Sequence, residues 1–168
     1  MLDEVLTKIV DRLHNINTYY PQARIALQSN HMDCFELFMK HGLDIKKRGI
    51  SDNLIHTAAW QGNVKIAKYI LDAGIPIDQR NSHKETALII AINNNQYEMM
   101  EYLLSKGANP NLQDKYGNTS LHYVAKSSSN KEMINICNRY KEKLDFTIKN
   151  NEGETPREVG ENDCFIKF

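Results

Sequence analysis

The sequence predicts an all-α protein of one domain, built as a solenoid of about four helix-turn-helix repeats. Three observations predict this fold. An apolar trio at helical spacing recurs along the chain, a second amphipathic segment follows each trio, and a glycine closes most of these second segments. A unit of about 33 residues cannot bury its own apolar face, so like neighbours must stack in a row.

The trios have the offsets 0, +3 and +4, which place three side chains on one face of a short helix. Successive trios lie about 33 residues apart, which is a regular internal repeat. The four sets are Ala23, Ala26 and Leu27; Ile55, Ala58 and Ala59; Leu88, Ala91 and Ile92; and Leu121, Val124 and Ala125.

The second segments have the offsets 0, +1, +4 and +5, so each unit has a second amphipathic helix. They start at Cys34, Ile66 and Met99, and the glycines that follow are Gly42, Gly74 and Gly107. Glycine suits the left-handed residue that ends a helix. The stretches 75–82 and 109–117 come next, and their Pro, Asn, Asp and Gly residues predict turns.

The stretch GNTSLHYVA (117–125) resembles the ankyrin-repeat family, whose pattern runs D-x-x-G-x-T-P-L-H-x-A-A. Residues 62–63, 103–111 and 152–156 match further parts of the pattern, and the resemblance covers about residues 20–160. The matching residues of the fourth unit are Asp114, Gly117, Thr119, Leu121, His122 and Ala125. The resemblance implies that first helices line a concave groove beside projecting finger loops, that Thr119 caps a helix, and that His122 links neighbouring repeats.

The chain departs from the family pattern at several places. Lys84 and Ser51 replace a turn glycine, and three residues are inserted around 127–130 and the following helix. We expect an N-terminal capping helix within 1–19, four repeats over about 20–149, and a partial repeat and tail over 150–168, polar because a terminal repeat faces water. A membrane-surface helix is the alternative for this N-terminal segment.

Composition argues against several function classes. Lys plus Arg equals Asp plus Glu at 21 each, so nothing predicts binding to nucleic acid or to a membrane. The three widely spaced cysteines predict neither a disulfide framework nor a metal site, and with no signal peptide we expect a cytoplasmic protein. No catalytic motif is present, so we expect no enzyme, no cofactor and no small-molecule substrate.

The residues expected to bind a partner are those that repeat packing does not require, on the concave face and at the finger tips. Trp60 is the only tryptophan and follows a packed pair of alanines, and Trp, Tyr and Arg dominate interface energies. Alternatively, Trp60 covers the N-terminal capping unit and has no part in binding. The candidate residues are Trp60, Gln61, Arg80, His83, Asn93, Asn94, Tyr116 and Lys126, with Lys47 and Arg48 in the first finger.

The sequence therefore predicts a non-enzymatic module that binds a folded protein through its concave face and fingers, and inhibits it by occlusion. Two settings fit, an immunity or antitoxin-like protein and a viral mimic of ankyrin inhibitors. A structural scaffold or assembly subunit is the alternative, and we expect a monomer for the occluding binder.

Overall fold

The computed structural model describes residues 25–26, 29, 32–40, 45, 54–127 and 130–160. Within these residues the chain is helical and contains no strand, which confirms the predicted all-α solenoid. The predicted capping helix (1–19), Lys47, Arg48 and the end of the tail (161–168) lie outside the described residues. The helices are α3 (Met32–Lys40), α4 (Leu54–Gln61), α5 (Val64–Asp72), α6 (Ala87–Asn93), α7 (Tyr97–Ser105), α8 (Ser120–Lys126), α9 (Lys131–Arg139) and α10 (Pro156–Val159), with a 3-10 turn at Lys141–Lys143.

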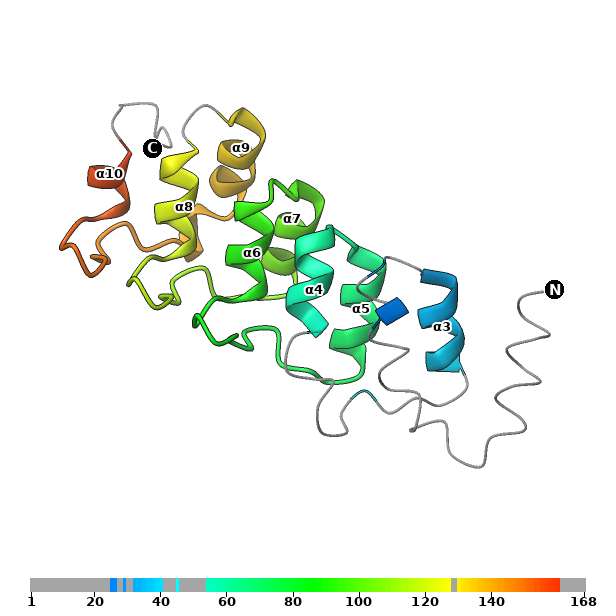
Figure 1. The fold of residues 1–168 in the computed structure, drawn as a ribbon. Helices are drawn as coiled ribbons and strands as arrows, with labels where there is room; N and C mark the ends of the chain where they lie inside the picture. The colour runs from blue at the N-terminus through cyan, green and yellow to red at the C-terminus, as the bar shows by residue number, and fades with distance from the viewer. Residues whose placement is uncertain are drawn as a thin grey trace.

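The helices stand in two parallel rows (Figure 1). The first helices of successive repeats, α4, α6, α8 and α10, contact one another in sequence order. The second helices α5, α7 and α9 form the other row, and α4 and α6 each contact the second helix of their own repeat. The stack is therefore a chain of nearest-neighbour contacts, as expected of a repeat protein.

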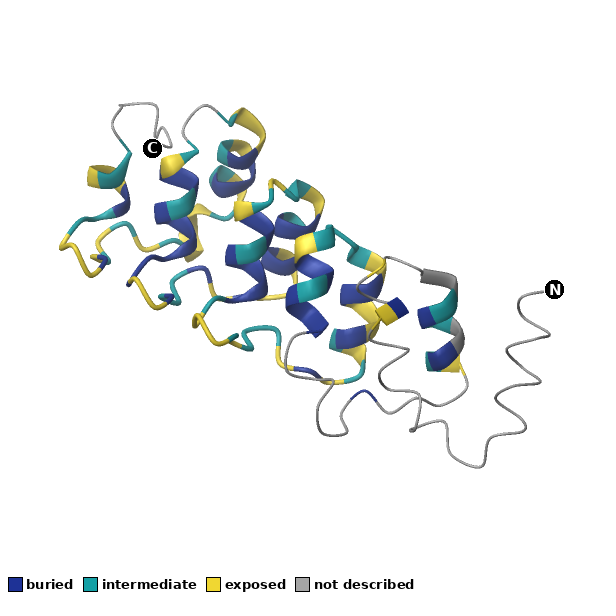
Figure 2. Cartoon of the chain, viewed as in Figure 1, coloured by how far each residue is buried: buried dark blue, intermediate teal, exposed yellow. Residues whose placement is uncertain are grey.

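The predicted trios form the core between the rows. Every member from Ile55 to Ala125 is buried, and Ala26 of the first trio is buried as well. Met99, Met100, Leu103 and Leu104 of α7 face the same core. Figure 2 shows the buried residues on the facing sides of the two rows.

Side-chain caps and glycines set the ends of the helices. Asn63 Oδ1 accepts the Ile66 N–H at 3.1 Å to begin α5, and Thr86 Oγ1 accepts the Ile89 N–H at 3.4 Å to begin α6. Gly74 and Gly107 follow α5 and α7 with φ of 84° and 92°, the left-handed conformation predicted for them.

The insertion in the fourth unit is divided between two places. The connection from α8 to α9 spans 127–130, one residue longer than the 94–96 connection from α6 to α7. The other two residues follow α9, where the 3-10 turn Lys141–Lys143 precedes the last finger. The extra length therefore enlarges loops and leaves the helices at their usual length.

The last repeat is a single helical turn with a polar outer side. Thr155 and Glu158 form a capping box, in which the Thr155 N–H donates to Glu158 Oε2 at 2.7 Å. Arg157 and Glu158 are exposed, and Pro156 is the buried residue that faces α8. The outer side of the stack is therefore polar up to residue 160, the last residue described, and the partial repeat over 150–168 stays a prediction.

Candidate protein-binding surface

Within the described residues, three finger loops connect the repeats and project from one side of the stack, at 73–86, 106–119 and 144–155 (Figure 1). Each finger is folded around one Asn or Asp side chain. Its Oδ1 accepts the backbone N–H groups two and four residues later, at 2.8 to 3.0 Å. These three residues are Asn81, Asp114 and Asn150.

Backbone hydrogen bonds tie each finger to the next. The Lys115 N–H donates to the His83 carbonyl at 2.9 Å, and the Asn151 N–H donates to the Tyr116 carbonyl at 3.0 Å. Because the fingers are fixed to one another, their tips form a preorganised edge, and less conformational entropy is lost when this edge binds a partner.

His122 links the fourth repeat to the last finger. Its Nδ1 accepts the backbone N–H of the N-cap residue Thr119 at 3.0 Å, so its proton lies on Nε2, which donates to the Glu154 carbonyl at 3.1 Å. The ring is buried, and burial lowers its pKa below the ordinary value. His122 is thus part of the architecture, as the family resemblance implies.

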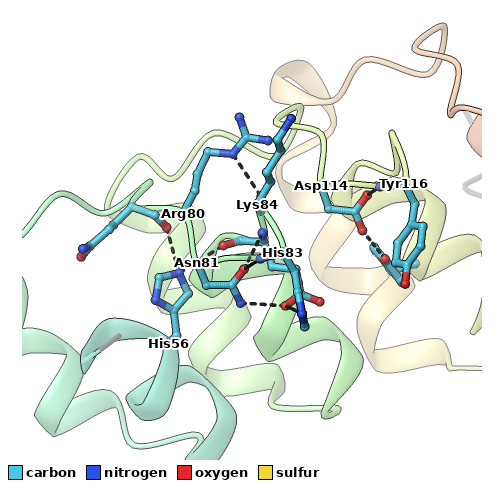
Figure 3. Close-up of polar contacts among 10 residues, drawn as sticks. His56, Arg80, Asn81, His83, Lys84, Asp114 and Tyr116 are labelled. Atoms are coloured by element: carbon cyan, nitrogen blue, oxygen red, sulfur yellow. Dashed lines mark hydrogen bonds and ion pairs between the residues drawn. The ribbon is translucent and has the colours of Figure 1, made fainter. Parts of the chain in front are cut away.

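His56 has the same role two repeats earlier. Its Nε2 lies 2.9 Å from the Gln79 carbonyl and 3.1 Å from the Glu85 carbonyl of the following finger (Figure 3). Burial lowers the pKa of His56 as well. Both histidines are therefore neutral hydrogen-bonding links, and within the described residues no three His, Cys, Asp or Glu side chains could hold a metal ion together.

The concave face has a hollow of about 640 Å³ between α4, α6 and the 73–86 finger. We define the concave face as the exposed side of the first helices together with the fingers. Trp60 is 60% exposed beside the hollow. The lining residues are His56, Thr57, Trp60, Asn81, Ser82, His83, Glu85, Ile90, Asn93 and Asn94.

The structure brings four of the predicted binding residues to this hollow, namely Trp60, His83, Asn93 and Asn94. Of these, Asn94 is partly engaged, because its Nδ2 donates to the Ile90 carbonyl at 2.8 Å. Trp60, His83 and Asn93 are the exposed members of this set.

The other predicted residues lie outside the hollow. Gln61 is half-buried at the end of α4, Lys126 is exposed at the end of α8, and Tyr116 is 57% exposed on the 106–119 finger. The guanidinium of Arg80 is engaged by backbone carbonyls of two fingers. Its Nε donates to the Lys84 carbonyl at 3.0 Å (Figure 3). Its Nη2 donates to the Gln113 carbonyl of the next finger.

Sequence reasoning missed Thr57, Ile90 and the equivalent Tyr123 of α8. Each lies three residues before the predicted concave residues Trp60, Asn93 and Lys126, on the same helical face. This offset was the signal that could have found them. Ile90 matters most, because it is the other apolar side chain that lines the hollow with Trp60.

Comparisons with known proteins agree with the repeat pattern. Residues 24–114 and 55–150 match a family model described as ankyrin repeats in three copies. Among similar proteins, an ankyrin repeat protein of fowlpox virus is 31% identical over 134 residues, 77% of this chain and 39% of its own length. The chicken nuclear factor NF-kappa-B p105 subunit is 30% identical over 109 residues, 61% of this chain and 11% of its own length.

A further relative is the phosphocholine transferase AnkX of Legionella pneumophila, which is 38% identical over 86 residues. That match covers 49% of this chain and 9% of the transferase. The chain thus spans well under half the length of these relatives. Within the described residues, no helix has the length and apolar character needed to cross a bilayer.

Proposed function

Because the chain belongs to the ankyrin-repeat family, we propose that it is a non-enzymatic module that binds a folded protein through its concave face and finger loops. Repeats of this family generally act as protein–protein interaction modules. The partner's identity is set by the exposed residues of the concave face, since the buried residues serve the stack.

The observation that carries this proposal is the exposed Trp60 ring beside the hollow. A large aromatic side chain left 60% exposed on a rigid helix offers much apolar area to a partner, with little side-chain entropy to lose. Ile90 and the amide of Asn93 line the same hollow, so an apolar anchor and polar groups that orient the partner lie together.

We further propose that binding inhibits the partner by occlusion. The chain extends as a stack, so that its fingers and first helices present one continuous side (Figure 1). Such a side is suited to covering a partner's own functional surface. Of the two settings that the sequence predicts, the fowlpox virus relative, matched over 77% of this chain, favours a viral inhibitor over an immunity protein.

Capture of binding proteins from host cells, followed by affinity measurement, tests the proposal. The Trp60→Ala variant should weaken the captured complex by about 2 kcal/mol or more, roughly 30-fold, if Trp60 is an anchor. Tyr69→Ala is the matched control, because Tyr69 is an exposed aromatic residue on α5 of the other row, 40% exposed. It should leave the affinity unchanged.

Equal affinities of the wild-type protein and the Trp60→Ala variant, with the fold intact by circular dichroism, would remove Trp60 from the interface. Size-exclusion chromatography tests the scaffold alternative at the same time. A 19.4 kDa monomer agrees with an occluding binder, and a large self-assembly would favour the scaffold.

A further inference from the structure

Two cationic side chains, Arg80 and Lys84, extend outward from the 73–86 finger (Figure 3). The guanidinium of Arg80 is fixed by its hydrogen bonds to two backbone carbonyls, those of Lys84 and Gln113. Both residues are exposed, and neither forms an ion pair with any carboxylate that the structure describes. The remaining N–H donors of Arg80 and the ammonium group of Lys84 are thus available to an anionic group from outside.

The carboxylates of the 73–86 and 106–119 fingers form hydrogen bonds within these loops and between them. Asp78 Oδ1 accepts the Asn109 N–H at 3.0 Å, and Asp114 is buried at 5% exposure, where it accepts backbone N–H groups of its own turn. Glu85 Oε2 accepts from the Asn81 amide at 2.7 Å. Lys115, by contrast, is exposed on the 106–119 finger. The outer edge of the two fingers is therefore positive, although the whole chain carries equal numbers of acidic and basic residues.

Lys84 occupies a backbone conformation that disfavours any side chain. Its φ is 59°, in the left-handed region, where the next two fingers have Gly117 and Gly153 with φ of 77° and 84°. Strained residues of this kind persist mainly where a function uses them. The ammonium group is the chemical feature that distinguishes Lys84 from these glycines, so the strain points to a role for this charge.

The hollow lined by Trp60 and Ile90 adjoins the positive edge. Asn81, His83 and Glu85 of the 73–86 finger line the hollow, together with Trp60 of α4 and Ile90 of α6. The carboxylate of Glu85 faces its own loop, where Oε2 accepts from the Asn81 amide and lies 3.8 Å from His83 Nδ1. A partner can thus reach the cations and the hollow across a single finger.

We propose that the partner meets this surface with an acidic segment, whose carboxylates bind Arg80 and Lys84 while a nearby large apolar side chain enters the hollow between Trp60 and Ile90. This inference rests on the proposed function and adds the chemistry of the partner. Carboxylates form short, charge-assisted hydrogen bonds with guanidinium and ammonium donors. The adjoining hollow, with the apolar side chains of Trp60 and Ile90 in its lining, favours a peptide over a nucleic acid, which would need cations spread along its backbone.

Selection from a displayed library of random dodecapeptides tests the proposed chemistry and requires no captured partner. The peptides enriched on the wild-type protein should combine Asp or Glu with a large apolar residue. A synthetic copy of the most enriched peptide should bind less tightly as salt rises from about 0.05 to about 0.5 M, because exposed charge pairs are screened.

The discriminating variant is Lys84→Gly, which removes the charge and leaves the finger with the residue that the next two fingers carry. It should weaken binding of the selected peptide about five-fold, as expected for loss of one partly exposed charge pair. Lys68→Ala removes an exposed lysine from α5 in the other row and is the control, with unchanged affinity expected.

Several results would overturn the proposal: enrichment of neutral or basic peptides, no enrichment, or equal binding of the acidic peptide to wild-type protein and Lys84→Gly. Tighter binding of a single-stranded DNA oligonucleotide or of phosphoserine versions of the peptides would assign the cations to another ligand. If a captured partner is lost by Trp60→Ala and retained by Lys84→Gly, the proposed function survives and this inference fails.

Discussion

Replacing Gly117 by alanine should destabilise the protein more than the same replacement of Gly153. Both glycines close a finger turn in the left-handed region, with φ of +77° and +84°. An L-residue there costs about 1–2 kcal/mol at either position. A Cβ at Gly153 meets nothing within 4 Å, whereas a Cβ at Gly117 would lie 2.6 Å from both the backbone N and Oδ1 of Asn151.

The extra cost at Gly117 comes from the contact between fingers. The backbone of Asn151 must move away, which breaks its hydrogen bond of 3.0 Å to the Tyr116 carbonyl. Displaced packing and one lost hydrogen bond add about 1–3 kcal/mol. We therefore expect the free energy of unfolding to fall by about 1–2 kcal/mol for Gly153→Ala and by about 2–5 kcal/mol for Gly117→Ala.

Urea denaturation followed by far-ultraviolet circular dichroism measures both values under the same conditions. The Gly153→Ala variant controls for the backbone strain, so the difference between the two reports the finger-to-finger contact alone. Equal destabilisation by the two variants would refute the reasoning, because it would mean that the last finger does not pack against Gly117 in solution.

Three further predictions concern stability. Leu121→Ala should lower the free energy of unfolding by about 2–5 kcal/mol, because Leu121 is 1% exposed in the core, and an unchanged melting temperature would contradict the repeat register. Lys84→Gly should raise the free energy of unfolding by about 1 kcal/mol by relieving the left-handed strain, and destabilisation in urea titrations would show that the lysine side chain supports the loop. Burial lowers the folded-state pKa of His56 and His122 below 6.5, so the unfolded chain binds more protons than the folded chain below that pH. The free energy of unfolding should therefore be full above about pH 6.5 and fall as the pH drops, by up to about 1.4 kcal/mol per pH unit for each histidine. Unfolding curves measured at several pH values should show part of this slope lost in His56→Gln.

The sequence predicted the stack because the pattern behind it is local. The offsets within each trio follow from helix geometry, and the interval between trios follows from the size of one unit. Buried Leu88, Ala91 and Ile92 of α6 confirm both. The glycine prediction was correct at Gly74 and Gly107 for the same reason, since the left-handed residue after α5 or α7 depends only on how that helix ends; Gly42 lies outside the described residues.

The candidate site could be predicted only in part, because it depends on contacts between repeats. Trp60 and Asn93 were found as helix positions that packing does not use, but the hollow between them depends on how α4, α6 and a finger loop lie together. Arg80 was predicted as an anchor from its residue type. Its hydrogen bond to the Gln113 carbonyl joins positions in successive repeats, and no local sequence pattern predicts such a contact.

The departure at Lys84 shows how a broken pattern can be informative. In the sequence, Lys84 replaces the turn glycine of the repeat pattern. In the structure, Lys84 is a strained residue that retains the left-handed conformation of that glycine. Its charge then belongs to the outer edge of the finger together with Arg80 (Figure 3). A departure from a repeat pattern is therefore a place to look for function, once the geometry shows that the fold did not change around it.

Hydrogen exchange of the chain, alone and in complex with a captured partner, tests the proposed binding surface most directly. Binding through the concave face predicts new protection of backbone amides in the 73–86 and 106–119 fingers and around Trp60. Protection confined to α5, α7 and α9 would place the partner on the opposite row and contradict the proposal.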